Sequence, residues 1–235
     1  MDTSLPDRRI LHCAHGPSTG TVLLKIVPTG EILECRDAIW GFVRRSAKGI
    51  SPDRVRDAKT RVTSVRRNRE IPPVKAVEEL SSCITILGRT DERFFLAQAL
   101  HIRAMAYASG MEDHPRAFRD WRRASGIVAG SPRESPEFRR LGAHIRFNMG
   151  LHASGPVRIR YYDQALRLCR EAGWRQGEAT VLVHRGLERK ERGERRKALR
   201  DLEVGLKIAR ERRMKALRQL RGFIRETESL PQSPT

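Results

Sequence analysis

The sequence has few aromatic residues, no closely spaced cysteines and no long apolar run. Aromatic residues make up 6% of its 235 residues, which argues against a broad surface for stacking nucleic-acid bases. The cysteines Cys13, Cys35, Cys83 and Cys169 form no Cys-x-x-Cys pair, so the sequence has neither a zinc ribbon nor a thioredoxin-like motif. Free thiols in a reducing cytoplasm are the simplest interpretation.

Other absences exclude further classes of protein. The longest apolar run, near Val22–Val27, is far too short to span a bilayer, and the residues up to Arg9 do not form a secretory signal. We therefore expect a cytoplasmic protein without membrane insertion. Because no motif joins a nucleophile, a base and an orienting group, we also expect no enzymatic activity, no metal and no cofactor.

Two short N-terminal motifs resemble functional sites only in part. His12, Cys13 and His15 could supply two or three metal ligands, but no second cluster offers a fourth, so a strand with surface histidines is favoured. The segment 16–21 contains glycines and hydroxyl residues, yet its spacing is too short for a phosphate loop and no lysine precedes the hydroxyl. A β-turn is the simpler interpretation.

Positive charge is abundant, with a net charge of +19 and a pI near 11.1. Such a field favours an anionic partner: nucleic acid, an acidic protein or a membrane surface. Between Arg185 and Arg221 there are fifteen Lys or Arg against six Asp or Glu, and a second cluster lies within 54–69. The alternative is a solvated face with weak ion pairs such as Glu188 with Arg192. The candidate anion-binding or nucleic-acid face comprises Arg54, Arg61, Arg66, Arg189, Arg192, Arg196, Arg200, Arg212 and Arg213.

A regular spacing indicates the architecture. The small residues Cys83, Ala124, Ala165 and Gly205 lie 41, 41 and 40 positions apart. A fixed period of 20–50 residues is typical of a repeat solenoid, and an apolar content of 39% suits helices that each bury one stripe. A large apolar residue stands three places before each small one: Leu80, Trp121, Tyr162 and Leu202.

Caps, prolines and apolar periodicity predict where the helices begin and end. Ser51-Pro52-Asp53 combines a capping hydroxyl, a proline at the first helical position and an acid in the first turn. Gly88 is predicted to close a helix in the left-handed conformation. The expected helices span about 52–68, 73–87, 90–109, 115–128, a segment from 136 that includes Met149, 157–171, 178–192, 195–210 and 213–226.

The N-terminal segment has a different character. Short β-rich runs at 9–13, 21–27 and 31–35 predict strands, which are too short to be stable alone. A short helix is expected at 37–47. Together with the helix at 52–68 it could form a helix-turn-helix, although the first helix of the first repeat is the favoured interpretation of 52–68. The expected organisation is 1–8 disordered, 9–50 a small β-hairpin element with a short helix, 51–226 a helical repeat domain, and 227–235 a disordered tail.

The repeats resemble the tetratricopeptide repeat family over about 73–226. One fragment that carries the likeness is Ala104–Gly110 followed by Ala117, Trp121 and Ala124; the other is Gly186, Gly193, Ala198, Leu202 and Gly205. Small residues let neighbouring helices approach and a bulky one fills the gap. The period near 41 is longer than the usual 34, and Arg189 stands where the family prefers an aromatic residue. The resemblance implies a right-handed α-solenoid whose concave groove holds a peptide or a partner's helix, with Gln98, His101, Met105, His144, Phe147, Thr180 and Lys190 facing that groove.

We therefore expect a mainly α, non-enzymatic interaction module that binds a protein or peptide partner. The alternative is a nucleic-acid-binding or transcription-associated regulatory protein that uses the basic helices at 52–69 and 185–221.

Overall fold

The chain divides into two compact units, Met1–Ser51 and Pro52–Thr235. The computed structural model describes residues 11–15, 22–26, 32–34, 50–68, 70–130, 135–214 and 217–229. No helix within these residues is both long enough and apolar enough to pass through a bilayer.

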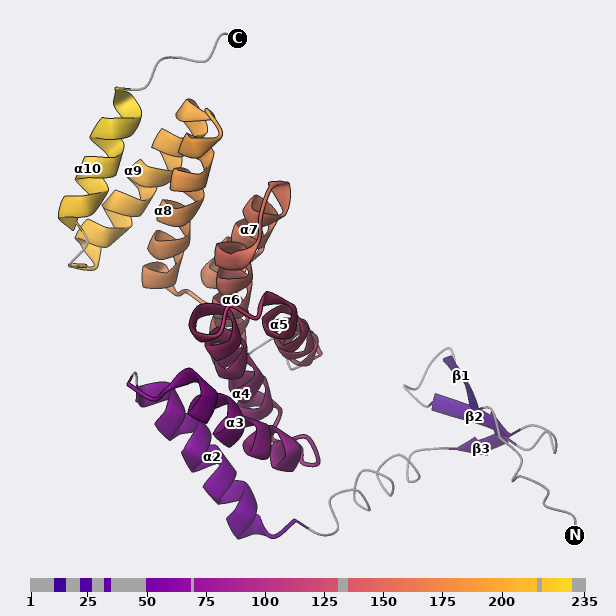
Figure 1. Cartoon of the computed structure of the whole chain (residues 1–235). Coiled ribbons are helices and arrows are strands. Elements are labelled where there is room, and N and C mark those ends of the chain that lie inside the picture. The colour runs from indigo at the N-terminus through magenta and orange to yellow at the C-terminus, as the bar shows by residue number, and fades with distance from the viewer. Residues whose placement is uncertain are drawn as a thin grey trace, which may run out of the picture. The chain divides into compact units, whose positions relative to one another are not determined.

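The described part of the first unit is a three-stranded antiparallel sheet whose strands pair in the order in which they follow along the chain. In its register, Cys13 lies opposite Leu24, and Leu24 lies opposite Leu33. The expected helix at 37–47 and the side chains of the possible metal motif at 12–15 lie outside the described residues. The strands are β1 (Leu11–His15), β2 (Val22–Ile26) and β3 (Ile32–Glu34) (Figure 1).

The second unit is built from helices, so the chain is mainly α. Their bounds agree with the expected ranges to within a few residues, because prolines and capping side chains mark several of the starts. The Asp113 carboxylate, for example, accepts a hydrogen bond from the Arg116 backbone N–H at 3.0 Å. The elements are α2 (Pro52–Arg67), α3 (Pro73–Leu87), α4 (Arg93–Met105), the π-helical turn η1 (Ala106–Gly110), α5 (His114–Ala129), α6 (Pro136–His152), α7 (Pro156–Glu171), α8 (Arg175–Glu191), α9 (Arg195–Glu211) and α10 (Leu217–Glu228).

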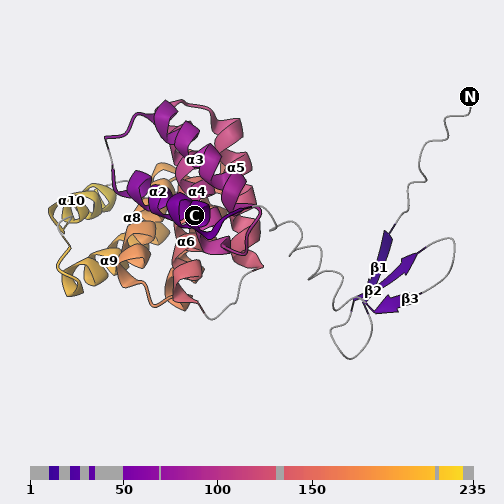
Figure 2. The same ribbon diagram turned by 90° about the horizontal axis from the view of Figure 1, so that it is seen from below.

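Consecutive helices pack against each other as stacked pairs: α2 with α3, α4 with α5, α6 with α7, and α8 with α9, while α10 packs on α9. Figures 1 and 2 show this succession from α2 to α10 in two perpendicular views. The first helices of the pairs also touch, α2 with α4, α4 with α6, and α8 with α10. We call α2, α4, α6, α8 and α10 the inner layer. The packing of α2 on α3 agrees with the favoured interpretation of α2 as the first helix of the first pair.

The recurring large and small residues form the contacts between paired helices. All eight of them are buried. At Gly186, an added Cβ would lie 2.9 Å from Leu202 Cγ, and at Gly205 it would lie 3.2 Å from Val183 Cγ2. Such spacings leave no room for a larger residue, so the small residues are needed for the close approach of α8 and α9.

The prediction of a left-handed cap at Gly88 is wrong. Gly88 has φ −65°, in the right-handed region, and its backbone N–H donates to the Ile84 carbonyl at 2.9 Å. A Cβ at this position would lie only 2.9 Å from the same carbonyl oxygen. Close approach of the backbone is therefore the reason for glycine there, whereas Gly173, with φ +60°, does adopt the left-handed conformation.

The last helix extends further than expected. α10 continues to Glu228, two residues into the segment 227–235 that was expected to be a tail. Thr227 is fully buried, and its hydroxyl donates to the Phe223 carbonyl at 2.6 Å. The Arg195 guanidinium donates to the Thr227 carbonyl at 3.1 Å, so this end of α10 is tied to the start of α9.

Candidate functional site

A cavity of about 770 Å³ lies on the inner layer, and we call it the inner cavity. Helices α2, α4 and α6 form most of its wall, joined by the start of α3 and by η1. This volume falls in the range typical of ligand-binding pockets. The lining residues are Val65, Arg66, Asn68, Ile71, Pro73, Ala76, Gln98, His101, Ile102, Met105, Ala106, Ser109, Gly110, Leu141, His144, Phe147 and Asn148.

Five of the residues expected to face a groove lie together in this wall. Gln98, His101 and Met105 come from α4, and His144 and Phe147 come from α6. Spacings of three and four residues place side chains on one face of a helix. Because α4 and α6 are in contact, the two faces form a continuous wall.

The other two expected groove residues lie elsewhere. Thr180 lines a separate pocket of about 310 Å³ whose wall also includes Val183 and Phe223. The Lys190 ammonium pairs with the Glu226 carboxylate at 2.8 Å. Both residues belong to α8, which contributes no lining residue to the inner cavity.

His101 is the most unusual side chain in the wall. It is 7% exposed, and its Nδ1 atom has no hydrogen-bond partner within the described residues. Burial, together with a smaller contribution from the nearby His144, whose ring centroid lies 6.3 Å away, lowers the pKa of His101 to about 3. The imidazole is therefore neutral at physiological pH and keeps one nitrogen available to a ligand.

Two neighbouring amides also have unused hydrogen-bonding capacity. Gln98 is 7% exposed, and its side chain makes no hydrogen bond to the described part of the chain. Asn148 donates through Nδ2 to the His144 carbonyl at 3.0 Å, which leaves its side-chain oxygen free to accept. Buried polar groups are normally hydrogen-bonded, so these groups suit a polar ligand.

Arg66 is the charged residue of the wall, and no Asp or Glu is among the lining residues. Burial lowers the pKa of His144, and the positive charge of Arg66 contributes to the same shift. Aromatic rings continue beyond the wall: the His144 ring lies 4.4 Å from that of Trp174, and the Phe147 ring lies 5.0 Å from that of His184. The inner layer therefore offers positive charge together with flat apolar surface.

The π-helical turn η1 was not foreseen from the sequence. It brings Ala106, Ser109 and Gly110 to the wall of the inner cavity. At Gly110 a Cβ would lie 2.3 Å from Pro73 Cγ. Because Pro73 begins α3, this glycine lets η1 approach α3 closely, and a π-helical turn of this kind often marks a functional site.

Several of the arginines assigned to an anion-binding face form ion pairs within the fold. Arg189, 17% exposed, lies 2.7 Å from the Asp201 carboxylate, and the expected pair of Arg192 with Glu188 is present at 2.7 Å. Arg61 lies 3.9 Å from Asp57. The remaining members on and after α9 are exposed: Arg196, Arg200, Arg212 and Arg213.

A recurring buried ion pair was also missed. The Arg103 guanidinium on α4 donates a hydrogen bond to each oxygen of the Asp120 carboxylate on α5, at 2.7 and 3.0 Å. The Arg185 guanidinium on α8 likewise donates a hydrogen bond to each oxygen of the Asp201 carboxylate on α9, at 2.8 and 2.6 Å. In both pairs the aspartate precedes the large residue of the repeat, so a spacing of 16–17 residues between Arg and Asp is the signal that could have revealed it.

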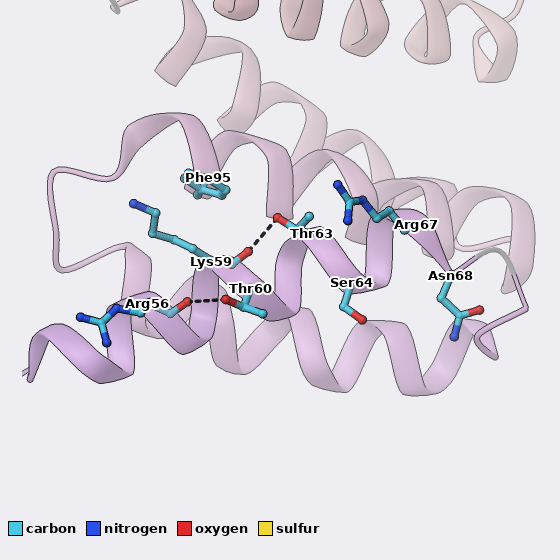
Figure 3. Close-up of a pocket in the computed structure, with 8 residues that line it drawn as sticks. All are labelled: Arg56, Lys59, Thr60, Thr63, Ser64, Arg67, Asn68 and Phe95. Atoms are coloured by element: carbon cyan, nitrogen blue, oxygen red, sulfur yellow. Dashed lines mark hydrogen bonds between the residues drawn. The ribbon is translucent and has the colours of Figure 1, made fainter.

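A second hollow of about 660 Å³ lies along α2, and we call it the outer basic face. Figure 3 shows Arg56, Lys59, Thr60, Thr63, Ser64, Arg67 and Asn68 along this helix, with Phe95 beside them. Arg56 pairs with Asp53 at 2.9 Å, and Lys59 pairs with Glu92 at 2.7 Å. Arg67 has no ion pair within the described residues. The predicted α2 residues differ from these: Arg66, for example, lines the inner cavity.

Comparison with known proteins identifies a structure with a similar fold but does not assign the chain to a family. No family model matches the chain, and no curated protein matches its sequence. The crystal structure of the apo form of RapI aligns with a TM-score of 0.57 and 14% sequence identity, covering 82% of this chain and 53% of RapI. The chain thus spans about half the length of RapI, and at this identity the likeness shows a shared helical fold alone.

Proposed function

We propose that the chain is a non-enzymatic helical-repeat module of tetratricopeptide type that binds a segment of a partner protein in the inner cavity. The observation that carries this proposal is the cavity itself, because five residues expected to face a groove form one wall of it. The apolar side chains of this wall can bury part of a ligand, and the unused hydrogen-bonding groups of its amides can bond to a peptide backbone.

A pair of equally exposed methionines provides the test. Met105 lies in the wall and is 40% exposed, while Met111 lies outside it and is 39% exposed. Met105→Glu places a charge on apolar surface that a bound segment would cover, so it should abolish capture of the partner. Met111→Glu should not.

The measurement is affinity capture with the wild-type chain and both variants, each with and without nuclease treatment. A protein that is retained by the wild type and by Met111→Glu, but lost with Met105→Glu, supports the proposal. Equal retention by all three proteins, or capture that disappears with nuclease alone, contradicts it.

The second candidate function is binding of nucleic acid at the outer basic face. It is favoured by three cations and three hydroxyl side chains along one side of α2, without an acid among the lining residues (Figure 3). It ranks second because Arg56 and Lys59 already have carboxylate partners. Such pairing reduces the charge available to phosphates.

Salt dependence distinguishes this candidate. Anisotropy titrations of a labelled duplex should show affinity that falls linearly on a log–log plot against salt, and Arg67→Gln should reduce the slope by about 0.9. Arg66→Gln, on the neighbouring residue, should leave it unchanged. Absence of binding at low salt would exclude this function.

A further inference from the structure

We propose that the inner cavity selects an acidic peptide segment: one carboxylate of the segment pairs with Arg66, while its backbone bonds to Gln98 and His101. This inference rests on the proposed function, because it names the kind of segment that the cavity binds.

The charge of the wall is unbalanced. The Arg66 side chain is exposed and has no ion pair within the described residues, and no carboxylate lines the cavity. A guanidinium forms two parallel hydrogen bonds to a carboxylate. The net charge of +19 on the whole chain also favours the approach of an acidic partner.

The buried part of the wall offers hydrogen bonds that the described protein groups do not use. These are the Nδ1 atom of His101, which is buried without a partner among the described residues, and the side-chain amide of Gln98; both residues are only 7% exposed. A peptide presents an N–H donor and a carbonyl acceptor at each residue, so one extended segment can satisfy both groups. Leaving such groups unpaired beneath a purely apolar ligand would weaken its binding.

The apolar part of the wall suits a side chain next to the acid. Met105 is 40% exposed, and Ile102 and Phe147 are partly exposed beside it. A nucleic-acid strand fits this arrangement poorly, because its affinity depends on several cations along the phosphate backbone, whereas the cavity wall contains one arginine.

The test uses the full chain and a phage-displayed library of random peptides. Selected peptides are synthesised with a fluorescent label in two forms, one as selected and one with each Asp or Glu replaced by Asn or Gln. Dissociation constants are measured by anisotropy for the wild type, Arg66→Gln and Arg67→Gln. Arg67 is the matched control, since it is adjacent on α2 but lines the outer basic face.

We expect the selected peptides to contain an acid, and the neutralised form to bind the wild type about tenfold more weakly or worse. Arg66→Gln should bind both forms equally, and Arg67→Gln should behave as the wild type. Selection of neutral or basic peptides, or an unchanged acidic preference in Arg66→Gln, overturns this inference and leaves the proposed function standing. Failure to select any peptide overturns both.

Discussion

At the scale of single residues, His101 links the candidate site to the stability of the fold. Its folded pKa is about 3, well below the ordinary value of 6.5. Between these values the unfolded chain binds a proton at this histidine and the folded chain does not. The free energy of unfolding therefore falls as the pH drops from 6.5 towards 3, by up to about 1.4 kcal/mol per pH unit for this one group.

His101→Gln tests this relation. The variant should lose the part of the acid sensitivity that His101 causes, so its stability relative to the wild type should improve by about 1.4 kcal/mol per pH unit between pH 6 and 4. Urea unfolding followed by circular dichroism at several pH values measures it. His144 and His184 titrate in both proteins and cancel in the difference. Parallel pH profiles for the two proteins would contradict the prediction.

Asp201 provides a second prediction at this scale. It is 4% exposed and accepts hydrogen bonds from Arg185 and Arg189. Asp201→Ala leaves two mostly buried guanidiniums without that carboxylate, which should destabilise the protein by about 3–5 kcal/mol. The exposed Glu203, on the same helix, is the control, and Glu203→Ala should change stability by less than about 0.5 kcal/mol. If Asp201→Ala reduced the free energy of unfolding as little as Glu203→Ala is expected to, the buried ion pairs would contribute little to stability.

The roles of these arginines could not be predicted from the sequence. Arg185, Arg189 and Arg192 belong to the basic block between 185 and 221, and their carboxylate partners belong partly to that block and partly to other helices. Counting charge along the chain does not reveal which groups face each other across two helices. The groove positions on α4 and α6, which the resemblance implies, lie three or four residues apart, and this spacing places them on one face of each helix.

At the scale of the helix pair, the repeat spacing was a reliable guide. Each large residue and its small partner lies in a buried contact, since close helix crossing requires both. The turn η1 was not predicted; it brings Gly110 close to Pro73, which is far away in sequence. Thr180 and Lys190 on α8 lie apart from the inner cavity: Thr180 lines a pocket that also includes Phe223 of α10, and Lys190 pairs with Glu226 of α10.

Two glycine substitutions separate packing from helix propensity. Gly186→Ala would place Cβ 2.9 Å from Leu202 Cγ and 3.2 Å from the Ala198 carbonyl oxygen, so it should destabilise the protein by about 1–3 kcal/mol. Gly126 in α5 is exposed, and a Cβ added there would meet no atom within 4 Å beyond its own helix backbone and chain neighbours. Gly126→Ala should therefore stabilise by about 0.5–1 kcal/mol. Denaturant unfolding measures both. Stabilisation by Gly186→Ala would show that α8 and α9 can separate without cost.

At the scale of the helical unit, the apolar core is divided along the chain. One buried cluster joins α2 to α6, a second joins α6 to α9, and a small third cluster includes Leu206, Ala209 and Leu220 on α9 and α10. In repeat architectures each element is stabilised mainly by its neighbours. Removal of the helix at one end of the unit should therefore reduce the stability of the neighbouring helices more than that of distant ones.

A chain that ends at Met214 tests this locality. Removing α10 exposes Leu206 and Ala209 to water, and burial of one apolar side chain is worth about 1.5–3 kcal/mol. Amide hydrogen exchange in α8 and α9 should therefore accelerate by about tenfold or more, while exchange in α2 to α5 stays close to that of the full chain. Mass spectrometry of peptic fragments measures both regions in one experiment. If exchange accelerated evenly from α2 to α9, the helical unit would unfold as one cooperative block. The stability of the helices around the inner cavity would then depend on α10, and the stabilisation would not be local.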